Sequence, residues 1–469
     1  MAVVLNAPLE WKTASGDAAT MLDELQPNIV KAHVRDYLFV LFLHFGDQAE
    51  AKAFLGALVP LMKSAKSHLQ EVEAHKSGGA PGTPYVGVGL THAGYVALGI
   101  AGASVPADAS FARGMRDADS RQTLGDPPVS TWDATFRDEI HAVVLIGDAT
   151  EPPAVTRRNE VEALIPDSIT LLGEETGRGM RNPDGDGIEH FGYVDGRSQP
   201  LFLIEDIDEE RRTTDGTTTW DPAFPLEQVL VADPAAPDPT VHFGSYFIFR
   251  KLEQNVRRFK EGEEQLATDL GLEDEDRERA GAMLVGRFED GTPLTIQRAP
   301  GAHHPVMNDF TYASDLDGQK CPFHAHIRKT NPRGSGGFEA PADERKHLMA
   351  RRGQTFGTRS DDPTAELPPS SRPTGDVGLL FMAFNSIIGQ QFDFTQGTWA
   401  NNPGFPSVPA GSAAPGVDQV IGHGPRPPIT AAVTWGGANV MTTDPVAEAV
   451  DMRGGEYFYM PSLAFLRSL

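Results

Sequence analysis

Apolar residues gather in short runs along the first half of the chain, and each run ends at a glycine or gives way to a helical pattern. Runs rich in aromatic and β-branched side chains cover 36–46, 85–90 and 139–146. This composition predicts buried β-strands. Apolar residues at helical spacing follow each run. They predict helices at 49–63, 91–98 and 155–164.

This alternation of strands and helices is typical of a ferredoxin-like unit. A similar pattern returns in the second half, where strands are predicted at 244–250 and 377–384. Each of them leads into a helical pattern, at 252–266 and 387–394. We therefore expect an α+β fold with two ferredoxin-like halves, although the two halves share no visible residue-level repeat.

A stretch rich in Pro, Ala and Asp at 232–239 resembles a linker between the halves. It predicts an N-terminal half at 1–235 and a C-terminal half at 236–469. Several long segments have the composition of loops, and long loops inside compact domains are often functional. These segments are 101–130, 205–240, 297–345, 353–376 and 400–430.

Charge and cysteine content exclude several classes of function. The 469 residues include 40 Lys and Arg against 65 Asp and Glu, a formal charge of −25. Such a balance argues against general binding to nucleic acid or to an anionic membrane, although it allows a locally basic pocket. The lone Cys321 excludes an intramolecular disulfide framework and a zinc site built from several thiolates.

The first residues carry no recognisable targeting pattern, because no basic region precedes an apolar stretch. The apolar run at 37–45 is far shorter than the ~20 residues that a membrane-spanning helix needs. We expect a cytoplasmic protein that does not enter a membrane, while export by another route remains compatible with the sequence.

Histidines and cations are concentrated in one region. The histidines are His303, His304, His324, His326 and His347. Their spacing matches no HExxH motif, but a single axial imidazole on a haem requires only one of them. His324 and His326 share a face in an extended chain, so spacing alone does not choose between them. The neighbouring cations Arg328, Lys329 and Arg333 fit either an anionic ligand or a basic turn paired with acids.

Two further segments carry candidate chemistry. Asp195 stands between Gly192 and Gly196, and glycine permits close approach of the backbone to a ligand. Asp-Gly is also an ordinary turn dipeptide. Arg351 and Arg352 offer a group that stabilises an anion, although paired arginines usually face solvent.

Together these segments resemble the dye-decolorizing peroxidase family of haem peroxidases. Gly192-x-x-Asp195-Gly196, followed by Ser-Gln-Pro at 198–200, resembles the GxxDG signature of the family. The segment 325–333 resembles its proximal-histidine segment, and 351–357 resembles its distal-arginine segment. The matches run in the family's order, and the long loops indicate its larger members.

The resemblance implies a dimeric α+β barrel with one haem b per chain, bound in the C-terminal half. His326 would be the proximal iron ligand, Asp195 the distal acid–base residue and Arg351 its partner that stabilises the peroxide anion. Arg333 would contact a haem propionate, together with the main chain around Gly192 and Gly196.

The resemblance further implies that Leu379 and Phe381 line the distal pocket, with ordinary core packing as the alternative. Asp393 would be the acceptor behind the proximal histidine. The expected partners are hydrogen peroxide and an aromatic reducing substrate such as a dye or a phenol, and an oligomer is compatible with the sequence.

A bulky dye does not fit a pocket sized for peroxide, which suggests electron transfer through surface aromatics. The candidates are Trp220, Trp399, Tyr457 and Tyr459. Two other readings stay open: a haem carrier or iron-releasing protein with incidental peroxidase activity, and a non-haem enzyme whose histidines hold a metal.

Overall fold

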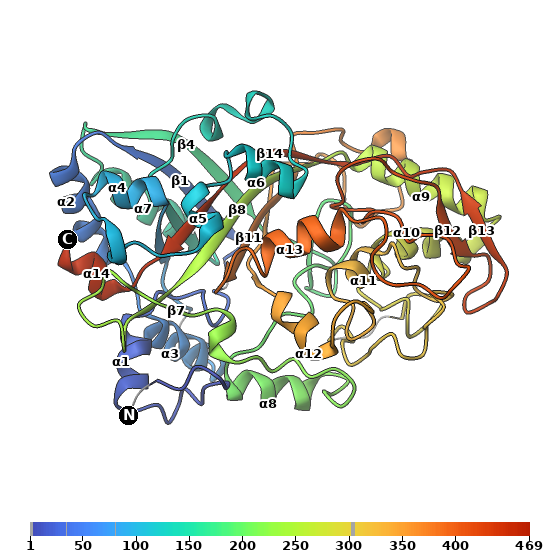
Figure 1. Cartoon of the computed structure of the whole chain (residues 1–469), viewed down its shortest axis with the longest axis horizontal. Helices are drawn as coiled ribbons and strands as arrows, with labels where there is room; N and C mark the ends of the chain where they lie inside the picture. Colours follow the sequence, from blue (N-terminus) through green and yellow to red (C-terminus); the bar gives the residue numbers. More distant parts are fainter. Residues whose placement is uncertain (1–2, 34, 80, 302–304) are drawn as a thin grey trace.

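The computed structural model describes residues 3–33, 35–79, 81–301 and 305–469 (Figure 1). Its main sheet contains ten strands in the order β7-β8-β14-β2-β3-β1-β4-β10-β11-β9. An additional pairing of β8 with β11 joins the sheet to itself, so that eight strands from β8 to β11 form a closed barrel. The predicted α+β barrel is therefore confirmed.

The strands alternate along the chain with helices, most of which are short. The strands are β1 (Tyr37–Phe45), β2 (Tyr85–Leu90), β3 (Ala142–Asp148), β4 (Ile169–Arg178), β5 (Met180–Arg181), β6 (Gly187–Ile188), β7 (Val231–Ala232), β8 (Phe243–Gln254), β9 (Ala350–Arg351), β10 (Gln354–Phe356), β11 (Gly378–Asn385), β12 (Ile429–Ala432), β13 (Val440–Thr443) and β14 (Val450–Met460). The α-helices are α1 (Asp17–Glu24), α2 (Gln48–Leu58), α3 (Ala65–Lys76), α4 (His92–Ala97), α5 (Ala109–Arg113), α6 (Ala118–Leu124), α7 (Glu151–Glu162), α8 (Ile204–Thr213), α9 (Val256–Asp269), α10 (Glu278–Val285), α11 (His326–Thr330), α12 (Pro341–Glu344), α13 (Phe392–Phe394) and α14 (Leu463–Ser468).

The barrel consists of two four-stranded groups. The order β2-β3-β1-β4 is the antiparallel order of a ferredoxin-like unit, and β8, β14, β10 and β11 form the other group. At each of the two seams a single residue pair joins the groups, Tyr459 with Leu90 and Phe356 with Gly177. The strands of the first group precede residue 235 and those of the second group follow it. The exact division at 235 stays a prediction.

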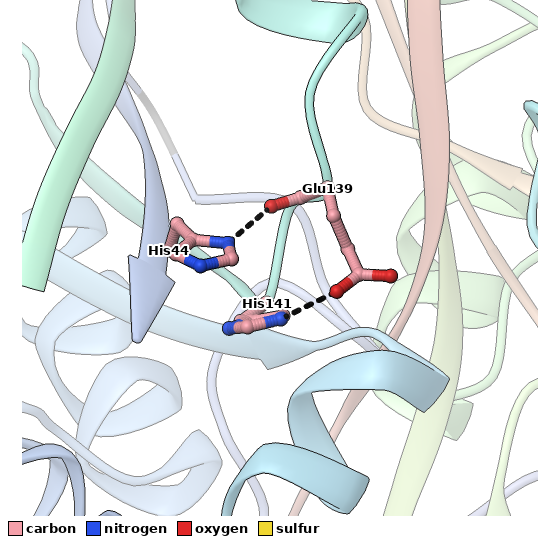
Figure 2. A group of neighbouring side chains, drawn as sticks. All are labelled: His44, Glu139 and His141. Atoms are coloured by element: carbon pink, nitrogen blue, oxygen red, sulfur yellow. Dashed lines mark hydrogen bonds and ion pairs between the residues drawn. The ribbon is translucent and has the colours of Figure 1, made fainter. Parts of the chain in front are cut away.

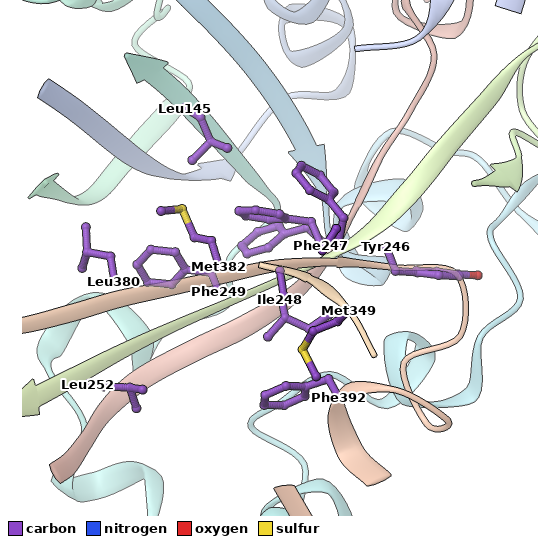
Figure 3. Close-up of a cluster of buried hydrophobic side chains, with 14 of the residues drawn as sticks. Leu145, Tyr246, Phe247, Ile248, Phe249, Leu252, Met349, Leu380, Met382 and Phe392 are labelled. Atoms are coloured by element: carbon purple, nitrogen blue, oxygen red, sulfur yellow. The ribbon is translucent and has the colours of Figure 1, made fainter. Parts of the chain in front are cut away.

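Aromatic side chains from both groups fill the barrel. Phe42 of β1 packs edge-on against Phe249 of β8, with ring centroids 4.9 Å apart, although the strands belong to different groups. Phe247 lies 5.2 Å from Phe384 of β11. Figure 3 shows these β8 residues near Met382, whereas Ile248 points to the other side of the strand. The alternation of a β-strand thus gives β8 one face for the barrel core and one for what lies outside it.

Side-chain caps start the helices that the sequence predicted. Asp47 accepts from two amides at the start of α2, Thr91 accepts from Gly94 at the start of α4, and Asn255 accepts from Arg258 at the start of α9. Helix α7 begins earlier than predicted because two prolines, which suit a first helical turn, stand ahead of the apolar pattern.

The helix predicted at 387–394 is wrong. The chain turns there instead, because the Gln391 side chain accepts hydrogen bonds from the amides of Ser386 and Ile387. Helical structure begins at α13 and continues as a π-helix over Thr395–Ala400.

Figure 1 shows the barrel strands in the middle of the molecule, with α2 and α14 at one end and α9, α10 and the β12–β13 ribbon at the other. Within the described part of the chain, no helix combines the length and the apolar character needed to cross a membrane.

Candidate active site

A cavity beside the barrel collects most of the side chains that the sequence singled out. Asp195 and Gly196 reach it from the loop after β6, His326 from the start of α11 and Arg351 from β9. Other predicted residues that line it are Arg333, Leu379 and Phe381. Its apolar walls include Leu252, Val285, Ile327 and Val420. Segments far apart in the sequence thus converge on one predominantly apolar space.

Asp195 and Arg351 form a pair at the cavity. Arg351 Nη1 lies 3.5 Å from Asp195 Oδ1, at the long end of hydrogen-bond distances. A hydrogen bond of 2.9 Å from Arg351 Nη2 to the carbonyl of Arg197 holds the guanidinium. About a third of each side chain is exposed, 32% for Arg351 and 37% for Asp195. Both groups can therefore meet a small polar molecule.

The two glycines of the loop have different roles. Gly192 has φ +103°, and a Cβ there would lie 3.2 Å from the carbonyl oxygen of Pro363. Gly192 is buried and is not among the residues that line the cavity, so it shapes the turn behind Asp195. Gly196, with φ +81°, does line the cavity.

His326 is supported by an acid that the sequence did not indicate. Its Nδ1 lies 2.9 Å from Oδ2 of Asp418, which is fully buried. The other oxygen of Asp418 accepts from the amides of Val420 and Ile421 at 2.8 and 2.9 Å. Burial opposes ionisation of Asp418, but His326 and these amides outweigh it and hold its pKa below the ordinary value.

The prediction that Asp393 supports the proximal histidine is corrected by this geometry. Asp393 accepts hydrogen bonds of 2.6 Å from the hydroxyls of Ser110 and Tyr457. The turn that replaces the predicted helix at 387–394 directs Asp393 toward α5 and β14. Asp418 lies 92 residues from His326 in a segment interpreted only as a loop, so no spacing could have identified it.

The cations Arg328 and Lys329, which follow His326, contact different partners. Arg328 forms a buried ion pair of 2.8 Å with Asp315 and lies between the rings of Tyr312 and Phe323. Lys329 Nζ donates to three backbone carbonyls, those of Asn402, Phe405 and Gly416. For Arg328 and Lys329, these contacts fit a structural role better than the binding of an anionic ligand.

Arg333 is buried in the cavity wall. It donates to the carbonyls of Asn308 and Phe310 at 2.8 and 2.6 Å, and also to the side chains of Ser198 and Asn308. The rings of Phe310 and Trp220 lie 3.9 and 4.7 Å from its guanidinium carbon. Burial lowers its pKa to about 9, and no carboxylate lies among these contacts to oppose that shift. A propionate contact for Arg333 stays a prediction.

Of the remaining histidines in this region, the two that the structure describes, His324 and His347, belong to no group of potential metal ligands among the described residues. His303 and His304 lie outside the described residues. His324 is buried, which lowers its pKa to about 3. His347 meets the carbonyl of Gln390 and a carboxylate oxygen of Glu339.

Among the described residues, a group of three potential ligands close enough to share an ion is found elsewhere, at His44, Glu139 and His141 (Figure 2). Its hydrogen bonds argue against a metal. His141 Nδ1 accepts from the amide of Phe45 at 2.9 Å, so the neutral ring carries its proton on Nε2, which faces Glu139 at 3.1 Å. That nitrogen has no lone pair to offer. The described residues therefore do not support the non-haem interpretation.

The prediction of surface aromatics is wrong for all four residues that it named. They are buried: Trp220 is 7% exposed, Trp399 2%, Tyr457 1% and Tyr459 0%. Tyr457 and Tyr459 belong to β14, where both side chains pack inside the protein.

An α+β barrel that brings a carboxylate-supported imidazole and a carboxylate–guanidinium pair to one apolar cavity is an architecture suited to a haem peroxidase. Comparison with known proteins narrows this class. A family model described as the DyP dimeric alpha+beta barrel domain matches residues 24–181. The chain is 68% identical to the multifunctional dye peroxidase DyP2 of Amycolatopsis sp., over 100% of both chains. It is 28% identical to Peroxidase 2 of Mycetinis scorodonius, over 97% of this chain and 89% of the relative.

Solved structures give the same result. The Amycolatopsis DyP2 structure superposes with a TM-score of 0.97 over 100% of both chains. A DyP-type peroxidase from Anabaena sp. superposes with a TM-score of 0.91, at 36% identity over 98% of this chain and 97% of the other. The chain belongs to the DyP-type peroxidase family and is a peroxidase. Enzymes of this family depend on haem.

Proposed function

We propose that this peroxidase holds one haem b per chain through His326, that Asp195 transfers the protons of peroxide cleavage, and that Arg351 stabilises the negative charge which then develops. One observation carries the proposal. The Asp195–Arg351 pair and the Asp418-supported imidazole of His326 meet at the same cavity.

The residues present fit a haem. If the His326 ring is neutral and donates Nδ1–H to Asp418, its Nε2 lone pair is left for a metal. Leu379, Phe381 and Val420 supply apolar walls for a porphyrin, and Arg333 supplies a cation for a propionate. When bound, the haem supplies the iron at which peroxide is reduced and the electrons that are later recovered from the donor.

The proton steps belong to Asp195. As a carboxylate it accepts a proton from one peroxide oxygen, and as a carboxylic acid it returns that proton to the oxygen that leaves as water. The guanidinium of Arg351 supplies the positive charge. Held by the carbonyl of Arg197, it faces the negative charge without having to reorganise.

The proposed reductants are dyes, phenols and other aromatic donors. One relative is named a multifunctional dye peroxidase, and a family structure at 28% identity is described as a complex with 2,6-dimethoxyphenol. Both names describe those proteins. For this chain they support aromatic donors as the class of substrate.

An iron-releasing role is the second candidate. The chain matches a deferrochelatase of Yersinia pestis at 32% identity, but only over 110 residues, 23% of this chain. DyP2 and Peroxidase 2, which match over nearly the whole chain, are both peroxidases, and this favours peroxide turnover over haem dismantling.

One experiment tests the proposal. The haem absorption spectrum is recorded, one equivalent of hydrogen peroxide is added, and the rate of the spectral change is measured. Asp195→Asn and Arg351→Leu should keep the resting spectrum and slow the change by roughly 10²-fold or more. An iron-releasing protein would react slowly and lose its haem spectrum. An unchanged rate in Asp195→Asn would refute the role of Asp195.

A further inference from the structure

A second carboxylate, Glu189, stands in the cavity wall six residues before Asp195. It follows β6 directly and is half-buried. Proton transfer does not require it. Its contacts nevertheless connect it to the loop that carries Asp195.

The Glu189 carboxylate closes the turn between the two acids. Oε2 accepts from the amide of Phe191 at 2.9 Å, and Oε1 accepts from the amide of Tyr193 at 3.0 Å. The side chain of Gln254, at the end of β8, donates to Oε2 as well. Three donors thus converge on two oxygens, which only the ionised carboxylate can fully accept.

The backbone transmits this closure to Asp195. The amide of Glu189 donates to the carbonyl of Tyr193 at 3.1 Å, and the amide of Asp195 donates to the carbonyl of Gly187 at 2.9 Å. The two sides of the turn are therefore paired, with Glu189 at its base and Asp195 just beyond it. A change in the turn would displace Asp195 relative to Arg351.

We propose that Glu189 is the positioning residue of Asp195: its ionised carboxylate holds the turn, and its protonation loosens the turn and slows proton transfer from peroxide. This inference rests on the proposed role of Asp195.

The surroundings of Glu189 place this change near neutral pH. Burial raises its pKa to about 7 against the hydrogen bonds from Phe191, Gln254 and Tyr193, and the charge of Asp195 acts in the same direction as burial. From β8 it meets the uncharged Gln254, and Lys260 of α9 pairs with Glu263 and Glu289 instead. Haem bound in the cavity would remove water beside Glu189, which also favours the raised value.

The test measures the rate of the peroxide-induced change in the haem spectrum from pH 5 to 9, by stopped flow on the holoenzyme. The rate in the unaltered protein should rise through a midpoint near pH 7. Glu189→Gln should react roughly ten- to a hundredfold more slowly above that midpoint and should lack the step. Glu189→Asp keeps the charge and should restore the step. The exposed Glu227 gives a matched control, and Glu227→Gln should behave as the unaltered protein does.

A second variant covers the case in which Glu189→Gln does not retain haem. Gln254→Leu removes a donor that favours ionised Glu189, so the midpoint should move upward by about half a pH unit or more. A step that persists in Glu189→Gln, or a midpoint that stays fixed in Gln254→Leu, would overturn the inference. If Asp195→Asn is slow in the same assay, only the role of Glu189 has failed. If Asp195→Asn is fast, the proposed function has failed.

Discussion

His326 Nδ1 lies 2.9 Å from Oδ2 of Asp418, and the two residues are 92 positions apart. The buried carboxylate orients the imidazole and, as a negative partner, increases the basicity of the nitrogen on the other side of the ring. Amides of Val420 and Ile421 fix Asp418 in turn. The chain thus supports its proposed iron ligand with a rigid, charged acceptor.

Replacing Asp418 with Asn should weaken that support. Asn can still accept a hydrogen bond, but it lacks the charge, so electron donation to the iron falls. We expect a higher iron reduction potential and a roughly ten- to a hundredfold loss in haem affinity or in peroxide reactivity. Spectroelectrochemistry and haem retention on a desalting column measure these effects.

Asp393→Asn is the matched control for this prediction. Asp393 bonds Ser110 and Tyr457, not His326, so its replacement should leave the potential where it was. A shift in Asp393→Asn that equals the shift in Asp418→Asn would contradict the assignment of Asp418.

Two of the strands that the sequence predicted, β2 and β3, lie wholly inside the protein. β2 and β3 are buried at every position and appear as continuous apolar runs. β4 mixes polar and apolar positions, and α8 is mostly charged, so neither showed a periodic apolar signal. Both hold their places through tertiary contacts, which a single sequence does not display.

The candidate site was predictable to the extent that its residues lie in local motifs. Asp195, His326 and Arg351 each stand in a recognisable segment, and all three line the cavity. Asp418 depends on a contact between distant loops. The Asp393 error has a local origin, because the side chain of Gln391, and not the apolar pattern, decides where the helix begins.

Arg333→Lys should destabilise the protein. The guanidinium donates four hydrogen bonds and lies between the rings of Phe310 and Trp220. A lysine ammonium has three donors and no planar face, so buried acceptors would lose partners. We expect a loss of about 2–4 kcal/mol in the free energy of unfolding, measured by chemical denaturation.

Arg298→Lys serves as the control for Arg333. Its side chain is 67% exposed and lies 3.9 Å from Asp276. Surface substitutions of this kind usually change stability by less than about 0.5 kcal/mol. Equal losses in the two variants would show that the contacts of Arg333 do not stabilise the cavity wall.

His68 should make the protein sensitive to acid. It is buried in α3, and burial, aided by the charge of Lys63, lowers its pKa to about 4. Between pH 6.5 and 4 the unfolded chain binds a proton that the folded chain does not, so stability falls as pH falls. The loss at pH 4 is at most about 3 kcal/mol.

His68→Phe should remove this part of the pH dependence, whereas His75→Phe, at an exposed position of the same helix, should not. Chemical denaturation at pH 4.5 and pH 7 compares the variants. The prediction fails if His68→Phe loses as much stability between these two pH values as the unaltered protein does.

Gly192→Ala and Gly185→Ala separate backbone strain from the placement of Asp195. Both glycines have positive φ, +103° and +88°, so alanine should cost roughly 1 kcal/mol of stability or more at each. A Cβ at Gly185 meets nothing within 4 Å, whereas one at Gly192 lies 3.2 Å from the carbonyl oxygen of Pro363.

Only Gly192→Ala must therefore shift the turn that carries Asp195. We expect it to slow the peroxide-induced spectral change roughly tenfold or more, while Gly185→Ala keeps the rate and loses only stability. Equal rates in the two variants would show that the turn at Gly192 does not position Asp195.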